Sequence, residues 1–110
     1  MTETRRFERS LKDQDEQQYV LRLYVTGMSP RSTQAIAAIK EICEHQLANR
    51  YDLEVIDIYQ KPALARGEQI IATPTLVRVL PLPLRRLIGD LADQERVLLG
   101  LDIHPARTRQ

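Results

Sequence analysis

Two apolar, strand-like segments separated by one long amphipathic segment constrain the fold of this chain more than any other feature. Tyr19–Val25 and Leu53–Ile58 are rich in β-branched, aromatic and aliphatic residues, as strands are. Between them, apolar residues recur at spacings of three and four and predict a helix over 30–47: Ile36, Ile39, Cys43 and Leu47. Two strands joined by such a helix form a βαβ unit with parallel strands and a right-handed crossover.

The ends of this unit carry their own signals. Ser29 is a good helix N-cap, and Pro30 falls at the first helical position, where its missing N–H costs nothing. Asn49 and Arg50 end the helix. The nearly continuous apolar character of Leu53–Ile58 predicts a strand that is covered on both faces.

Length and composition indicate one globular domain. The chain has 110 residues, of which 43% are apolar and 28% charged. No apolar run approaches the ~20 residues of a membrane span, and the N-terminus lacks the apolar core of a secretory signal, so we expect a cytoplasmic protein without membrane contact. A net charge of +1 without a basic stripe argues against nucleic-acid binding. We expect a domain over 19–103 between flexible segments at 1–18 and 104–110.

The second half of the chain gives two incompatible predictions. A short helix over 61–67 and a strand over Thr75–Val79 are followed by Pro81 and Pro83, which cannot donate to a β-ladder. Four apolar residues then match the helical spacing i, i+3, i+4 and i+7: Leu84, Leu87, Ile88 and Leu91. Four later ones alternate as in a strand: Val97, Leu99, Leu101 and Ile103. From periodicity we expect a helix around 85–88 and a strand over 97–103.

The opposite assignment is that of thioredoxin-like domains. These domains have a turn that leads into a strand beside their active site, and the segment Thr73-Pro74-Thr75-Leu76 resembles that turn. It requires a strand at 85–88 and a helix from about Asp93 to Leu101, capped by Asp90 or Asp93. Gly89 suits it as a turn residue with positive φ. Inside a helix, Gly89 would cost about 1 kcal/mol relative to Ala. The residues alone leave both assignments open.

Signatures of catalysis are absent from the sequence. There is no glycine-rich phosphate loop, no G-x-S-x-G and no H-E-x-x-H motif, and the two histidines, His45 and His104, are far apart. The turn where a thiol oxidoreductase would carry C-x-x-C reads Met28-Ser29-Pro30-Arg31. Cys43 lies among apolar helix residues and is interpreted as a small core residue. We therefore expect no enzyme activity, no cofactor and no metal site.

Six segments within 19–103 resemble, in order and spacing, the circadian clock protein family KaiB: 21–27, 55–58, 71–76, 78–81, 85–91 and 98–102. The most specific are Ala-Thr-Pro-Thr-Leu at 72–76 and Arg-Arg-Leu-Ile-Gly-Asp-Leu at 85–91. The resemblance implies a single-domain, thioredoxin-like α/β protein that is metamorphic and not an enzyme. Its ground state would be a homo-oligomer, a dimer or tetramer, with element order βαββααβ. A rarer βαβαββα monomer would bind a KaiC-type ATPase.

The resemblance also implies roles for individual residues. Gly89 and Asp90 match the pair that controls the switch, and changing them to Ala and Arg is expected to favour the thioredoxin-like monomer. Three prolines match the rearranging segment: Pro74, Pro81 and Pro83. Four arginines occupy basic positions that we expect to contact a partner: Arg22, Arg78, Arg85 and Arg86.

Two hypotheses about function follow. The first is a fold-switching adaptor that modulates the phosphorylation cycle or signalling output of a KaiC-type ATPase, with a KaiA-like protein or a histidine kinase as further candidate partners. The second is a non-switching thioredoxin-like sensor domain of the kind found in clock-associated histidine kinases. Pro81-Leu82-Pro83, the long N-terminal segment and the non-acidic C-terminal end depart from the family pattern. They suggest a divergent member from outside the cyanobacteria.

Overall fold

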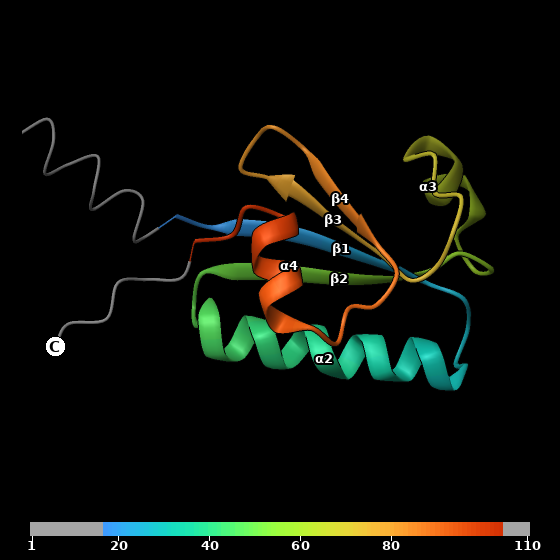
Figure 1. Cartoon of the computed structure of the whole chain (residues 1–110). Coiled ribbons are helices and arrows are strands. Elements are labelled where there is room, and N and C mark those ends of the chain that lie inside the picture. The colour runs from blue at the N-terminus through green and yellow to red at the C-terminus, as the bar shows by residue number, and fades with distance from the viewer. Residues whose placement is uncertain (1–16, 105–110) are drawn as a thin grey trace, which may run out of the picture.

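The computed structural model describes residues 17–104, which form one four-stranded mixed sheet with three helices (Figure 1). In chain order the elements are β1 (Tyr19–Val25), α2 (Pro30–Gln46), β2 (Tyr51–Asp57), α3 (Pro62–Gly67), β3 (Thr75–Leu80), β4 (Arg85–Ile88) and α4 (Gln94–Gly100). This is the βαβαββα order of the thioredoxin-like assignment. The predicted flanking segments lie almost wholly outside the described residues.

The sheet is built around β1. The strand order is β2-β1-β3-β4, with β1 parallel to β2 and antiparallel to β3, and with β3 antiparallel to β4. The parallel pair and the long helix between its strands confirm the predicted βαβ unit. Within residues 17–104, no helix combines the length and the apolar character needed to cross a bilayer.

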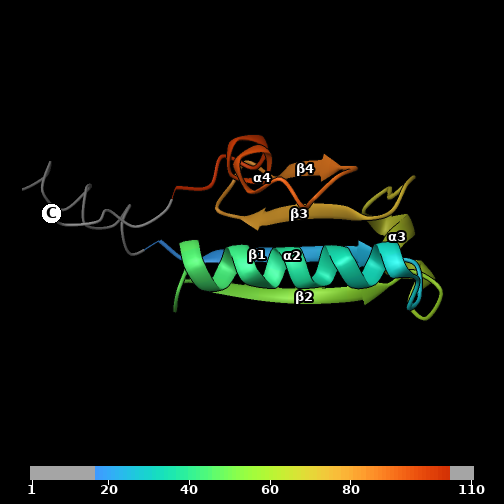
Figure 2. The same cartoon turned by 60° about the horizontal axis from the view of Figure 1, so that its bottom comes forward.

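Helices α2 and α4 cover the same face of the sheet, where the main core lies (Figure 2). The core joins alternate residues of β1 to apolar residues of α2, of α4 and of the C-cap of α4: Leu21, Leu23, Val25, Ile39, Ile42, Val97 and Leu101. The six-residue α3 lies at one end of the molecule, beyond the sheet (Figure 1). Most of the second sheet face therefore has no helix over it.

Helix α2 begins where its sequence signals predict. The Ser29 hydroxyl oxygen accepts a hydrogen bond from the backbone N–H of Ser32 (3.2 Å), and Pro30 is the first helical residue. The chain leaves the helix at Leu47 and turns through Asn49, whose φ of +62° suits the residue type that most readily adopts the left-handed region after glycine.

The second half adopts the assignment that periodicity disfavoured. Residues 85–88 form β4 and 94–100 form α4, so the expected helix and strand are both wrong for this structure. Asp93 caps α4 by accepting a hydrogen bond from the backbone N–H of Arg96 (3.2 Å). The alternating pattern failed because it counted Leu99 as a core residue, whereas Leu99 is 76% exposed. Val97 and Leu101, spaced as i and i+4, are the buried pair.

Strand β2 corrects a second expectation. It is an edge strand, and all but one of its residues are exposed or half-exposed instead of being covered on both faces. Ile56 is buried, while Glu54 and Val55 are exposed. The expected cover on both faces is missing because β2 lies at the edge of the sheet and α3, with six residues, is too short to cover its second face along the whole strand.

A buried arginine of β3 holds the C-terminal end of α4. Arg78 is only 3% exposed. Its Nη1 donates to the carbonyl oxygens of Leu101 (2.8 Å) and Asp102 (2.9 Å), and its Nη2 donates to the carbonyl oxygen of Pro83 (2.8 Å). Carbonyls at a helix C-terminus lack intrahelical partners and carry partial negative charge, so a cation is favourable there. Arg78 thus connects α4 and the β3–β4 loop to the sheet, and its three hydrogen bonds are called the arginine clamp below.

Cys43 tests the packing of α2 against the sheet. Its side chain is 1% exposed, and burial raises the pKa of its thiol to about 12. Because the thiolate is the reactive form, we expect native protein at pH 8 to react with a thiol reagent such as DTNB far more slowly than denatured protein. Stopped-flow labelling with and without urea measures the ratio of the two reaction rates. Equal rates would contradict the burial of this helix face.

Arg78→Lys tests the arginine clamp. Lysine keeps the buried charge, but one ammonium cannot reach all three carbonyls that the planar guanidinium contacts. We expect the free energy of unfolding to fall by about 1–3 kcal/mol in urea denaturation followed by circular dichroism. Arg85→Lys is the matched control, because Arg85 is the exposed register partner of Arg78 and should change stability by less than about 0.5 kcal/mol. Equal losses in the two variants would exclude the clamp.

Candidate interaction surface

A row of charged side chains crosses the second face of the sheet, opposite α2 and α4. The strand register aligns Glu54 of β2 with Arg22 of β1, Arg22 with Val77 of β3, and Val77 with Arg86 of β4. Paired residues of neighbouring strands project to the same face. This face of the sheet therefore carries Glu54, Arg22 and Arg86 in one line, with the buried Val77 between the two arginines.

Glu68, the C-cap residue of α3, joins this row from the side. Its Oε1 lies 3.7 Å from Nη1 of Arg22, and its Oε2 lies 3.7 Å from Nη2 of Arg86. Arg22 also pairs with Glu54, with Nε and Oε1 3.5 Å apart. The four charged residues Arg22, Glu54, Glu68 and Arg86 are called the charged row below. All four side chains are partly exposed, so each pair contributes only about 0.2–1 kcal/mol to stability.

A small apolar cluster lies beneath the charged row. Tyr24, Ile56 and Val77 are buried there, and Ile58, Ile70 and Val79 pack against them. Burial raises the pKa of Tyr24, so its phenol remains neutral at physiological pH and adds no charge to the surface. The face thus combines partly exposed charged side chains with a buried apolar cluster directly under them, which is a common composition for a protein-binding surface.

The structure separates the four arginines that the sequence grouped. Arg22 and Arg86 share the charged row. Arg85 is exposed but pairs in register with Arg78, so it projects toward the α4 side of the sheet. Arg78 is enclosed in its clamp and is not available to a partner in this conformation.

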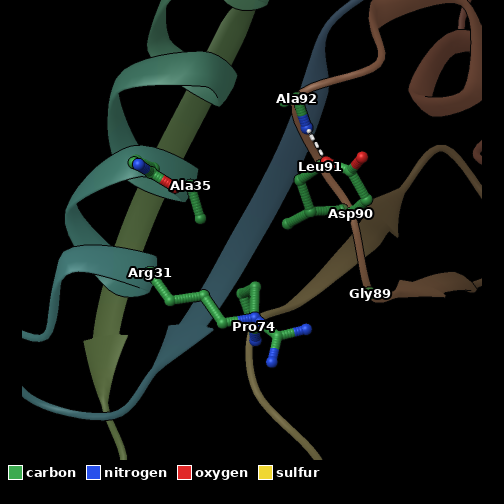
Figure 3. A pocket seen from close by; sticks show the side chains of 8 residues that line it. Arg31, Ala35, Pro74, Gly89, Asp90, Leu91 and Ala92 are labelled. Atoms are coloured by element: carbon green, nitrogen blue, oxygen red, sulfur yellow. Dashed lines mark hydrogen bonds between the residues drawn. The ribbon is translucent and has the colours of Figure 1, made fainter.

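Residues of the expected switch also fall into two places. Pro74, Gly89 and Asp90 line a cavity of about 230 Å³ between α2 and the segment that follows β4, and Arg31 reaches toward Pro74 from α2 (Figure 3). Pro81 and Pro83 lie in the β3–β4 loop, away from this cavity. Each of the three prolines follows a cis peptide bond.

The backbone at Gly89 bears on the expected effect of substitutions at 89 and 90. Gly89 has a φ of +111°, a conformation that residues with a Cβ rarely adopt. The Asp90 carboxylate accepts a hydrogen bond from the backbone N–H of Ala92 (2.9 Å) and so stabilises the same turn. Ala at 89 would be strained in this conformation and Arg at 90 would lose this hydrogen bond, which argues against the expectation that the two changes favour the thioredoxin-like monomer.

Sequence reasoning missed the two acids of the charged row. Glu54 was recognisable in principle, because it shares the two-residue period of Ile56 on β2. Glu68 carried no signal, because it lies outside every strand and its position depends on where α3 sits against the sheet.

Comparison with known proteins agrees with this architecture. The KaiB domain model matches residues 22–103. The chain is 53% identical over 91 residues to circadian clock protein KaiB3 of Synechocystis sp., covering 83% of this chain and 89% of that protein. It is 52% identical over 85 residues to circadian clock oscillator protein KaiB of Synechococcus elongatus, covering 77% and 83%.

Solved structures give the fold. The N-terminal domain of SasA from Synechococcus elongatus superposes with a TM-score of 0.64 at 30% identity, covering 76% of this chain and 80% of that one. Mitochondrial thioredoxin 3 from Saccharomyces cerevisiae superposes with a TM-score of 0.63 at 12% identity, covering 87% and 88%, which shows the thioredoxin-like fold alone. From the domain match and the clock relatives more than half identical to it, this chain belongs to the KaiB family, whose members are non-enzymatic clock proteins.

Proposed function

We propose that this protein is an adaptor that binds a KaiC-type ATPase through the open sheet face and modulates the phosphorylation cycle or signalling output of that ATPase. The observation that carries the proposal is the charged row, which sets Arg22 and Arg86 on either side of Val77 on a face without a covering helix. The family membership supplies the clock context. The named relatives are clock proteins. A KaiC-type ATPase is the partner that the family resemblance implies, and its assignment to this chain is part of the proposal.

The geometry favours Arg22 and Arg86 as contact residues over the other two arginines. Both extend from strands whose backbones are fixed by the ladder, so a partner that binds them orders side chains and no backbone. Arg85 projects from the other face of β4, which is an edge strand. A partner would contact Arg85 only if it reached around this edge of the sheet. Arg78 acts indirectly, by holding the β3–β4 loop and α4.

The binding surface is tested by removing one positive charge at a time. Arg22→Gln and Arg86→Gln should each weaken binding to a KaiC-type ATPase by roughly three- to tenfold, with the larger effect at low salt. Arg96→Gln removes the same charge from exposed α4, on the opposite side of the sheet, and should bind as the wild type does. Biolayer interferometry with immobilised ATPase measures the three affinities. Equal affinities, or no binding by the wild type, would refute this proposal.

We further propose that the protein switches between this fold and a βαββααβ ground state that is a homo-oligomer, a dimer or tetramer. Support comes from residues 84–103, whose helical and alternating periodicities fit the second fold, while the structure adopts the first. Three of the eight residues that the alternative patterns would bury are exposed here: Leu84 is 39%, Ile88 43% and Leu99 76% exposed. Two packings separated by a few kcal/mol are the physical condition for switching.

Two substitutions should move this equilibrium in opposite directions. Gly89→Ala is strained at φ +111° but gains about 1 kcal/mol in a helix over 84–91, so it favours the ground state. Leu99→Glu remains exposed on α4 but would carry a charge toward the core of a strand over 97–103, so it favours the thioredoxin-like state. Two-dimensional ¹⁵N NMR and size-exclusion chromatography report the two populations.

Gly67→Ala is the matched control for the glycine substitution. Its Cβ would meet no atom within 4 Å, and Gly67 does not have the positive φ of Gly89. The control should leave the populations and the partner-binding rate unchanged. A single set of NMR signals in the wild type and all variants would contradict switching.

The alternative function is a non-switching thioredoxin-like domain that recognises the same ATPase. The similarity to the SasA N-terminal domain favours it. The higher identity to the KaiB relatives favours the adaptor. One strand pattern at all temperatures and protein concentrations, together with ATPase binding, would support this alternative.

A further inference from the structure

Glu68 occupies both of the arginines that the proposed function assigns to partner binding. We propose that Glu68 is an internal substitute for a partner carboxylate, and that the open face takes an acidic protein segment whose carboxylates replace Glu68 at Arg22 and Arg86. This inference rests on the proposed function for the identity of the partner. It adds the chemistry of the contact and an autoinhibitory residue.

The internal ion pairs are loose. The three N···O distances in the charged row are 3.5, 3.7 and 3.7 Å, whereas charge-assisted hydrogen bonds between guanidinium and carboxylate are about 2.7–2.9 Å. Glu68 divides its two oxygens between two arginines and makes a bidentate contact with neither. The guanidinium groups therefore retain donors that an incoming carboxylate can use in the planar, two-bond geometry that arginine favours.

Glu68 can leave without disturbing the sheet. It belongs to the end of α3 and not to a strand, and its backbone N–H donates to the carbonyl oxygen of Leu64 (3.1 Å), so the backbone is held independently of the side chain. Its side chain is 23% exposed, so a rotation about its own bonds carries the carboxylate into solvent. Glu54 is different, because it lies on β2 and, among residues 17–104, pairs with Arg22 alone.

The charge balance determines the kind of partner. With Glu68 in place, the charged row holds two arginines and two glutamates and is neutral. When Glu68 moves away, Arg22 and Arg86 face only Glu54, so the vacated surface is positive. A basic or neutral surface gains nothing by displacing Glu68, whereas an acidic segment does, so the contact selects acidic partners.

Glu68→Gln tests this competition. The variant keeps the size of the side chain and removes its charge, so it should bind a KaiC-type ATPase about two- to tenfold more tightly at low salt, with a smaller gain at high salt. Glu41→Gln makes the same charge change on exposed α2, which covers the opposite face, and should match the wild type. Glu68→Asp, too short to bridge both arginines, should fall between the wild type and Glu68→Gln.

A partner-free probe separates this inference from the proposed function. Hexaglutamate peptide is titrated into each protein, and the Arg22 and Arg86 Nε–H signals are followed by NMR. We expect larger affinity in Glu68→Gln than in Glu41→Gln, and loss of the gain when Arg86→Gln is added. An ATPase that does not bind the wild type would refute the proposed function, while a hexaglutamate gain would still support the displacement.

The inference is overturned if Glu68→Gln binds both the ATPase and hexaglutamate no more tightly than Glu41→Gln does. Weaker binding by Glu68→Gln, with an unchanged circular dichroism spectrum, would also overturn it, since Glu68 would then help to hold the arginines for the partner.

Discussion

The structure depends on the alternation of side chains along β1. This strand lies inside the sheet, parallel to β2 and antiparallel to β3, so both of its backbone edges are paired. Leu21, Leu23 and Val25 enter the core beneath α2 and α4, while Arg22 and Tyr24 project to the other face. A shift of one residue in register would exchange these two sets, so the buried face determines the position of every strand that pairs with β1.

The first half of the chain could be predicted because its signals are local and mutually consistent. Strand composition, the apolar stripe of the helix and the Ser29–Pro30 cap all indicate the same βαβ unit. The second half could not be decided locally, because residues 84–103 match one pattern as well as the other. The outcome depends on distant contacts: Val97 and Leu101 enter the core, and Arg78 holds the carbonyls at the end of α4.

The candidate site could also be predicted only in part, because some of its contacts join residues that are distant in sequence. Arg22 and Arg86 were expected to contact a partner because the family resemblance places basic residues there, and the structure brings both to one face of the sheet. Burial of Arg78 was not predicted, because its acceptors are backbone carbonyls that leave no trace in residue types. Glu68 was missed for a related reason: its contacts are with strands far from it in sequence, and only the path of the chain after α3 brings them together.

The brevity of α3 explains why the second face can serve as a surface at all. Six helical residues leave the charged row uncovered, and three of its four members are held by strand backbones. The alternation along β1 then separates two properties of the molecule. Substitutions at the positions that face the helices are expected to change the free energy of unfolding, whereas under the proposed function those at 22, 54 and 86 would change partner recognition. Related proteins can therefore diverge in partner preference along the same strands that keep their stability constant.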